Sequence, residues 1–354
     1  MMTARDRYLA FASFQPVDRV PRRVDFASES VKENLRQYIG KPPEEAFSMD
    51  TGRGTGLKPP PDFTFPDYSV YHPGYTDNEN GFSIDWFGIG RQGHGFHHFT
   101  ETVSPLKKAA TFEELKAYPY ICNEGWLEDA MAEAAREAKE QGFPAVVWVG
   151  HMYEIAWQLR GYEEFLIDLL IQPEWAEYIL DRFCENNLRT ATAAARHGYD
   201  TIHIGDDIAN QNTLMFSPET WRTFMKPRWA NVIAAARKIK PDIHVWYHSD
   251  GNITDVLDEI VEIGIDILNP VQPECMDPYA IRKCYGKRLA FDGCVGTQTT
   301  FPFGTPDDMR RIIHELGEGL DARNGGLMLS PTHVLEPEVP PENIVAFFEA
   351  CDEL

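Results

Sequence analysis

The chain has 354 residues, of which 43% are hydrophobic and 25% charged, so it can bury a large core as one barrel-sized domain or as two smaller domains. Its net charge of −22 repels phosphate backbones and anionic membrane surfaces, which argues against nucleic acids and membranes as partners. Six scattered cysteines without a C-x-x-C pair are typical of reduced thiols, and neither a signal peptide nor an apolar stretch of about 18 residues occurs. We therefore expect a cytoplasmic protein.

The first strand is expected at residues 20–26, and an irregular excursion follows over about residues 40–110. The excursion has no clear periodicity but contains many prolines, glycines and aromatic residues. A segment of this length without regular structure is usually functional or disordered, and its aromatic content argues against disorder. His94, His97 and His98 lie in this excursion and are expected to be exposed rather than metal ligands.

From about residue 123 onward, strand-like apolar runs alternate with amphipathic helical runs. Six further strands are expected at residues 145–150, 201–205, 244–247, 265–268, 289–291 and 327–329. Ser217 and Thr305 each precede a proline in the manner of a helix N-cap, and Gly198 ends the helical run that begins after Pro173. Strands separated by helices pair in parallel. Seven or eight such units favour one α/β domain over residues 1–354, a closed (β/α)8 (TIM) barrel rather than an open sheet. The excursion is then expected to fold over the barrel mouth or to pack against a second subunit.

Polar side chains follow six of these expected strands, at the end where β/α barrels place their chemistry. They are His151 and Glu154, Asp206 and Asp207, His248 and Asp250, Asn269 and Gln272, Asp292 and Cys294, and His333. Ordinary polar loops would contain lysine, serine and glutamate as readily as histidine, aspartate and asparagine. The sequence therefore predicts a mouth lined for catalysis or binding.

The most informative of these strand ends is the segment that begins at His248 and ends at Gly251. His248 and Asp250 are two residues apart on an extended strand, so they share one face. A histidine and an aspartate that satisfy each other in a core would give the same pattern. With His333 they form a set of two histidines and one carboxylate, which suits zinc and also non-haem iron. Glu154 is a candidate fourth ligand, and Asp206 or Asn269 would orient the imidazoles.

Several motifs along most of the chain carry a resemblance to a known family. They are Asp18-Arg19-Val20-Pro21, Asp85-Trp86-Phe87-Gly88, Gly205-Asp206-Asp207, Ser217-Pro218-Glu219, His248-Ser249-Asp250-Gly251, Asn269-Pro270-Val271-Gln272 and Pro331-Thr332-His333. Their order and spacing resemble the uroporphyrinogen decarboxylase superfamily, and more closely its cobalamin-dependent methyltransferase branch. The resemblance implies a (β/α)8 barrel, and a homodimer as in the decarboxylases. It also implies functional roles, which are substrate contact for Asp25, Asp85, His151, Asn269 and Gln272, and catalysis, as proton donors or orienting groups, for Glu154, Asp206 and Asp207.

The sequence departs from both branches of this superfamily. Porphyrinogen decarboxylases have an arginine-bearing motif after the first strand, whereas residues 25–30 here contain two acids and no arginine, and Arg22 and Arg23 lie inside the expected strand. A highly anionic substrate would be repelled by such a loop. The methyltransferase branch has a His-x-Cys…Cys zinc pattern, and here His248 matches its histidine, Asp250 stands at the first cysteine and His333 lies near the second.

Oxygen and nitrogen ligands in place of sulfur imply a harder metal site, and zinc is the expected ion. The metal is expected to polarise the oxygen of a small methyl ether or alcohol. The resemblance then implies a metal-assisted methyltransferase whose methyl group passes to a corrinoid (cobalamin) on a separate partner protein. Two alternatives stay open. One is a decarboxylase of a porphyrinogen or a related carboxylated substrate, and the other is a non-catalytic barrel that binds a small molecule or a corrinoid.

Overall fold

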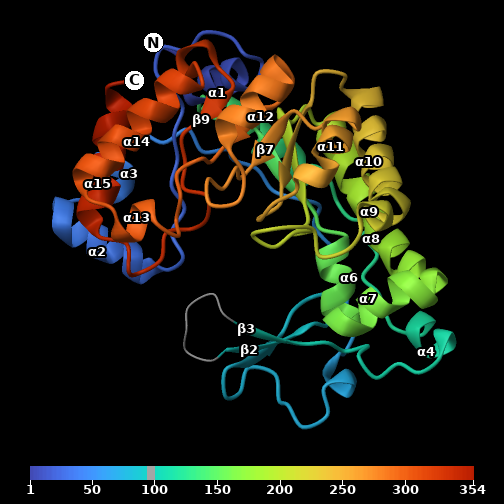
Figure 1. Ribbon diagram of the computed structural model, residues 1–354. Coiled ribbons are helices and arrows are strands. Elements are labelled where there is room, and N and C mark those ends of the chain that lie inside the picture. Colours follow the sequence, from blue (N-terminus) through green and yellow to red (C-terminus); the bar gives the residue numbers. More distant parts are fainter. Residues whose placement is uncertain (94–99) are drawn as a thin grey trace.

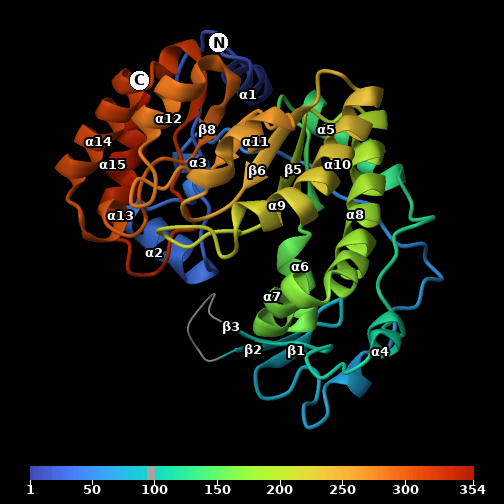
Figure 2. The ribbon, with the colours of Figure 1, turned by 45° about the vertical axis from the view of Figure 1, so that its right-hand side comes forward.

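The computed structural model describes residues 1–93 and 100–354, so His94, His97 and His98 lie outside the described residues. The protein is an α/β protein built on a six-stranded parallel sheet in the order β4-β5-β6-β7-β8-β9 (Figure 1). Helices α8 and α10 flank this sheet on one side and α14 and α15 lie on the other, as both views show (Figure 2). Among the described helices, none has the length and apolar character needed to cross a bilayer.

The strands are β1 (Phe82–Ile84), β2 (Gly90–Gly93), β3 (Thr100–Val103), β4 (Val146–Gly150), β5 (Thr201–Gly205), β6 (His244–His248), β7 (Ile267–Asn269), β8 (Ala290–Asp292) and β9 (Leu327–Met328). The helices of the first half are α1 (Ala4–Ala12), α2 (Glu29–Ile39), α3 (Pro43–Ala46), α4 (Phe112–Lys116), α5 (Asp129–Glu140), α6 (Tyr153–Arg160), α7 (Tyr162–Ile171) and α8 (Pro173–Arg196). Those of the second half are α9 (Pro218–Phe224), α10 (Lys226–Ile239), α11 (Leu257–Glu262), α12 (Pro278–Tyr285), α13 (Thr300–Phe303), α14 (Pro306–Gly319) and α15 (Pro341–Asp352). Short 3-10 turns occur at Ser69–Tyr71, Thr254–Val256, Gly286–Arg288 and Ala322–Asn324.

The expected parallel α/β architecture is confirmed, and the six strands expected after residue 123 all form. The expected helix starts are confirmed as well. The Ser217 side chain accepts a hydrogen bond from the Thr220 N–H at the start of α9, and Thr305 forms a capping box with Asp308 at the start of α14. Local capping chemistry therefore fixes where these helices begin.

The strand expected at residues 20–26 is wrong as a regular strand. This segment makes only isolated parallel bridges, between Arg22 and Leu329 and between Phe26 and Leu335. Pro21 has no N–H to donate, which is one reason why the ladder is interrupted here. The segment nevertheless lies beside β9, because the Leu329 N–H donates to the Pro21 carbonyl at 2.8 Å.

A second irregular segment, around residues 50–53, connects this edge back to β4. The Asp50 N–H donates to the Arg22 carbonyl at 2.8 Å, and Arg53 forms a parallel bridge with Ala145, directly before β4. Hydrogen bonds thus lead from β9 through residues 22, 50 and 53 to β4. The two edges of the six-stranded sheet are joined by segments that contain no regular strand.

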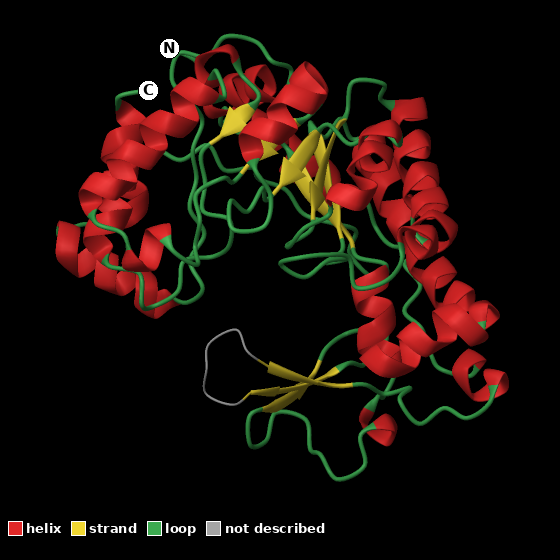
Figure 3. Ribbon diagram, viewed as in Figure 1, coloured by secondary structure: helices red, strands yellow, loops and turns green. Residues whose placement is uncertain are grey.

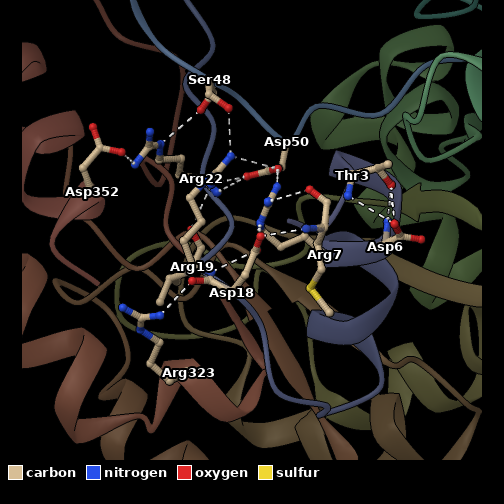
Figure 4. A network of polar contacts seen from close by, with 12 residues as sticks. Thr3, Asp6, Arg7, Asp18, Arg19, Arg22, Ser48, Asp50, Arg323 and Asp352 are labelled. Atoms are coloured by element: carbon tan, nitrogen blue, oxygen red, sulfur yellow. Dashed lines mark hydrogen bonds and ion pairs between the residues drawn. The ribbon is translucent and has the colours of Figure 1, made fainter.

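A buried ion-pair network holds these joining segments and α1 in place (Figure 4). The Asp50 carboxylate, which is fully buried, accepts hydrogen bonds from the guanidinium groups of Arg7 and Arg19 at 2.6 Å and from the Arg22 N–H at 3.1 Å. Arg7 is also buried and donates to Asp18 at 2.8 Å. One carboxylate therefore links the first helix to both segments that join the sheet edges.

The first helix closes the amino-terminal end of the parallel sheet. Tyr8 and Phe11 of α1 pack in one buried cluster with Trp246 of β6, Ala290 of β8 and Met328 of β9. These apolar side chains fill the space at this end of the sheet. The carboxyl ends of the strands remain lined by polar side chains.

The excursion at residues 40–110 is not wholly irregular, which corrects the expectation. Part of it is a three-stranded antiparallel sheet, with Phe82 opposite Gln92 and Gln92 opposite Glu101, set apart from the parallel sheet (Figure 3). Its strands of three or four residues are too short for a visible alternation pattern. Arg91 of β2 donates to the Gln158 side chain of α6 at 2.6 Å, so the small sheet is attached beside α6.

Candidate functional site

Side chains at the carboxyl ends of the parallel strands line a cavity of about 610 Å³, which we call the mouth cavity. Its ionisable and aromatic walls are Arg23, Asp25, Trp148, His151, Glu154, His203, Asp207, Trp246, His248 and His333, and Asn269 also lines it. Its volume is within the range of about 300–1,000 Å³ that is usual for small-molecule sites. Most of these residues were predicted from the strand ends.

His151 and Glu154 form a close pair at the end of β4 and the start of α6. His151 Nδ1 lies 2.6 Å from Glu154 Oε2 and 2.8 Å from the Gly205 carbonyl oxygen. Burial disfavours the charged imidazole, but the hydrogen bond and charge of Glu154 outweigh this and raise the pKa of His151 to about 9. Burial also acts to raise the pKa of Glu154, yet His151 and the Asp207 N–H lower it. The pair is therefore an imidazolium and a carboxylate at neutral pH.

Asp206 lies behind this pair and is fully buried. Its Oδ1 accepts hydrogen bonds from the Met152 N–H at 2.9 Å and the Glu154 N–H at 3.0 Å, and its Oδ2 accepts one from Trp229 Nε1 at 3.2 Å. Burial raises the pKa of Asp206 to about 7, with His151 opposing the rise. The structure thus places Asp206 where it fixes the start of α6, whereas Glu154 and His151 face the cavity.

Asp207, His248 and Asp250 form a second group, with one ligand-type atom from each residue lying within 4.8 Å of the others. Asp207 Oδ1 accepts from the Asp250 N–H at 2.8 Å and lies 3.5 Å from His248 Nε2. Burial raises the pKa of Asp250 to about 6, with the charge of His248 opposing the rise. Asp250 Oδ1 is buried and has no hydrogen-bond partner among the described residues. The structure therefore brings the predicted residues His248 and Asp250 together, with Asp207 rather than the predicted His333 as the third member of the group. His333 lines the mouth cavity with Asp207 and His248, and it also lines a neighbouring cavity with Asp250.

Asn269 at the end of β7 sets the orientation of the His248 ring. Asn269 Nδ2 donates to the Asp292 carbonyl oxygen at 2.7 Å, which leaves Asn269 Oδ1 facing His248 Nδ1 at 2.7 Å. An amide oxygen can only accept, so His248 Nδ1 must carry a hydrogen. In a neutral imidazole, Nε2 is then the free lone pair, and this atom faces Asp207.

In its neutral form, His248 is expected to carry its proton on Nδ1, and ¹⁵N chemical shifts of the labelled imidazole nitrogens measure this directly. The Asn269→Ala variant is expected to lose the preference because the amide oxygen that accepts from Nδ1 is removed. The Asn324→Ala variant, at an exposed turn, serves as the matched control and is expected to leave the shifts unchanged. A neutral His248 protonated on Nε2 would contradict the assignment.

The Trp246 ring stacks against the rings of His248 and His203. The Trp246 ring lies 5.8 Å from the His248 ring at an interplanar angle of 10° and 4.4 Å from the His203 ring at 20°. Burial, with the charge of Arg23 adding to it, lowers the pKa of His203 to about 3, so this ring is neutral. His203 is therefore a neutral ring that supports the stack.

Arg23 is a cavity residue that the sequence analysis missed. Its guanidinium forms ion pairs with Asp25 and with Asp292, the latter at 3.2 Å. Asp292 also accepts from Trp246 Nε1 and from the Ser330 hydroxyl, each at 2.8 Å. Successive residues of an extended segment point to opposite faces, so one of the two consecutive arginines at positions 22 and 23 had to face inward. Because the Arg23 charge is matched by two carboxylates, it leaves no net positive patch in the cavity.

The other predicted substrate contacts are spread over different places. Asp85 lies in the turn between β1 and β2, where its carboxylate accepts from the N–H groups of Phe87 and Ile89, and it lines neither the mouth cavity nor a neighbouring one. Gln272 accepts from the Gly251 N–H at 2.7 Å and lines a smaller cavity of about 290 Å³ that shares His333 with the mouth cavity. The structure thus gathers His151, Asn269 and Asp25 at the mouth but not Asp85.

A polar cavity at the carboxyl ends of parallel strands is the arrangement of an α/β enzyme. The family model for uroporphyrinogen decarboxylase (URO-D) matches residues 100–354, and the chain belongs to this family. It is similar to the uroporphyrinogen decarboxylase of Trichodesmium erythraeum, with 23% identity over 255 residues that cover 72% of this chain and 68% of that protein. It is also similar to the uroporphyrinogen decarboxylase of Nostoc punctiforme, with 23% identity over 278 residues that cover 77% and 74% of the two chains.

Among solved structures, a methyltransferase from Methanosarcina mazei aligns with the whole chain. The alignment covers 100% of this chain and 99% of the other, with a TM-score of 0.65 and 21% identity. At this level of identity the likeness establishes a shared fold. The expected membership in the superfamily is confirmed, and the fold is that of a full-length relative described as a methyltransferase.

Proposed function

We propose that this protein is a metal-assisted methyltransferase that moves a methyl group from a small methyl ether or alcohol to a corrinoid carried by a partner protein. The observation that carries the proposal is the group of Asp207, His248 and Asp250. Asp207 and His248 line the mouth cavity, and Asp250 lines the neighbouring cavity of about 290 Å³. The full-length likeness to a methyltransferase supports it. Similarity to two decarboxylases at 23% identity shows the family but does not favour their substrate, because the Arg23 charge is already neutralised by two carboxylates.

The residues present fit a zinc ion. They offer one imidazole nitrogen and two carboxylates, which are ordinary zinc ligands, and the hydrogen bond to Asn269 leaves His248 Nε2 as the free nitrogen. Asp250 Oδ1 is buried and has no hydrogen-bond partner in the described part of the chain, and a bound cation would satisfy such an oxygen. A zinc ion held there would act as a Lewis acid on the oxygen of the methyl donor.

The reaction needs one proton for the leaving oxygen. The carbon–oxygen bond of the donor breaks, the methyl group passes to the reduced cobalt of the acceptor corrinoid, and the donor oxygen keeps the bonding electrons and takes up a proton. We assign the donation of this proton to His151, which lines the mouth cavity. His151 is protonated at neutral pH because the neighbouring Glu154 raises its pKa. Asp206 is a positioning residue, because its hydrogen bonds hold the backbone of Met152 and Glu154.

The proposal includes a complete (β/α)8 barrel. Six of its positions are the regular strands, and the segments at residues 22–26 and 50–53 would stand at the other two, since their bridges join β9 to β4. A homodimer, suggested by the family, and the corrinoid partner belong to the same proposal. The proposed barrel is supported by the mouth cavity, whose polar residues lie at the carboxyl ends of the strands.

The deciding experiment compares two reactions with the same purified protein. The zinc-loaded full-length protein is incubated without oxygen with cob(I)alamin and with methanol or anisole, and methylcobalamin formation is followed by its absorbance. In parallel, the protein is incubated with uroporphyrinogen and the products are separated by chromatography. We expect methyl transfer that depends on zinc, and no decarboxylation. Zinc-independent decarboxylation of uroporphyrinogen would replace the proposal with the decarboxylase alternative, and the absence of both reactions would favour a binding protein.

A further inference from the structure

A second cavity, of about 570 Å³, adjoins the mouth cavity and has a different character; we call it the aromatic cavity. It lies between the excursion, the end of β4 and α8. Its aromatic walls are Trp86, Phe87, Trp126, Trp148 and Phe183. Trp148 and His151 belong to the linings of both cavities, so the two spaces meet at these side chains.

The aromatic walls come from segments far apart in the chain and present ring faces and edges to the same space. The Trp86 ring lies 6.1 Å from the Trp126 ring, and the Phe87 ring lies 5.6 Å from the Phe183 ring of α8. Trp86 is 52% exposed and Trp148 is 41% exposed. Large rings left this open inside a cavity, rather than singly on a surface, suit a flat aromatic ligand, since aromatic pairs are attractive beyond the area they bury.

The aromatic cavity offers hydrogen-bond donors to a ligand and has no carboxylate on its described walls. Among the described residues that line it, none is an aspartate or a glutamate, although the whole chain carries a net charge of −22. Trp126 Nε1 is buried and has no hydrogen-bond partner within the described parts of the chain. Lys58 forms no ion pair with any other described residue, and its backbone pairs with Leu127, directly next to Trp126.

The asparagine amide N–H groups of this wall donate within the protein, including that of Asn187, which donates to the His151 carbonyl at 3.2 Å. The amide group of Asn123 donates to the Asn186 carbonyl and to Thr190, and the amide group of Asn186 donates to the Ile121 carbonyl. An indole N–H and an ammonium group therefore remain for a ligand. Such donors prefer an acceptor that carries negative charge.

We infer that the aromatic cavity binds an aromatic carboxylate, with its ring among the tryptophan side chains and its carboxylate toward Trp126 Nε1 and Lys58. The inference names the substrate class for the proposed methyl transfer, a methoxy-substituted aromatic acid, and in that respect it rests on the proposed function. Because Trp148 and His151 line both cavities, a ring held in the aromatic cavity has the mouth cavity as its neighbour. Binding itself requires neither metal nor corrinoid.

The test is isothermal titration calorimetry of the zinc-free full-length protein with 4-methoxybenzoate as the probe. Anisole has the ring without the charge, and cyclohexanecarboxylate has the charge without the aromatic ring. We expect each of these to bind at least about 10-fold more weakly than the probe, because each lacks one of the two recognised features. The Trp126→Phe variant keeps a ring but loses the N–H, and is expected to weaken binding roughly 10-fold. The Lys58→Gln variant is expected to weaken it about 3-fold, since this lysine is exposed.

The Lys41→Gln variant removes an exposed lysine outside the cavity and is the matched control, with unchanged affinity expected. Circular dichroism shows whether each variant is folded. Equal affinity for the probe and cyclohexanecarboxylate, or folded Trp126→Phe and Lys58→Gln variants that bind like the unmodified protein, would overturn the inference. Probe binding with the expected variant effects but no methyl transfer would overturn only the proposed function. Methyl transfer from methanol without probe binding would overturn only this inference.

Discussion

Replacement of His248 by alanine is expected to abolish stoichiometric zinc binding and to lower methyl transfer by more than about 100-fold. Loss of a residue that merely orients a metal ligand typically costs about 10–100-fold in affinity or activity, so loss of the ligand itself should cost more. His248 provides the single nitrogen of its group, and the two carboxylates of Asp207 and Asp250 would be left facing each other. Zinc content by mass spectrometry and the methylcobalamin assay measure the two effects.

The matched control for this substitution is His314→Ala. His314 lies on α14, is partly exposed and pairs with Glu353 at 2.8 Å, away from the mouth cavity. Its replacement is expected to change neither zinc content nor activity. Full zinc content in His248→Ala would show that the metal is held elsewhere, and full activity in a zinc-free His248→Ala variant would remove the metal from the reaction.

Replacement of Asp50 by alanine is expected to lower the free energy of unfolding by about 3–5 kcal/mol, the cost of breaking a buried ion pair by removing one partner. The Asp50 carboxylate is fully buried and is shared by Arg7, Arg19 and the Arg22 N–H (Figure 4). Without it, the buried Arg7 guanidinium keeps, among the described residues, only the partly exposed Asp18 as a charged partner. Urea denaturation followed by circular dichroism gives the change.

Asp242→Ala is the matched control for the Asp50 substitution. Asp242 pairs with Lys240 at 2.9 Å, but its side chain is 83% exposed, and exposed pairs contribute about 0–1 kcal/mol. A loss at Asp50 no larger than the loss at Asp242 would show that the network does not stabilise the fold. Because Asp50 links α1 to both segments that join the sheet edges, the loss is expected in the cooperative unfolding of the whole sheet.

The parts of the fold that follow from local chemistry were predictable. Strands after residue 123 are continuous apolar runs between helices with visible caps, such as Ser217 and Thr305, and each formed where expected. The small antiparallel sheet was not predictable, because its short strands pair only with one another and carry no periodic pattern. The interrupted segment at residues 20–26 was expected as a strand, but its pairing depends on β9, about 300 residues later in the sequence.

The candidate site shows the same division. The strand-end rule found His151, Asp207, His248 and Asn269, because residues after parallel strands meet at one edge of the sheet. It did not predict how these residues divide into two groups, since that depends on the register between neighbouring strands and on backbone N–H groups such as that of Asp250. The aromatic cavity was not predicted either, because its walls come from five separate segments of the chain.

The way in which the sheet edges are joined has a consequence for synthesis of the chain. Arg323, just before β9, donates to the Asp18 carbonyl, 305 residues earlier, and β9 is the neighbour of the segment at residues 20–26. The segment at residues 20–26 is therefore synthesised long before β9, and its edge toward β9 stays without its partner until β9 is made. Until then the growing sheet keeps an unpaired edge, and such edges recruit strands from other molecules. Contacts this distant in sequence also form slowly. The nascent protein is thus most exposed to misassembly until β9 is made.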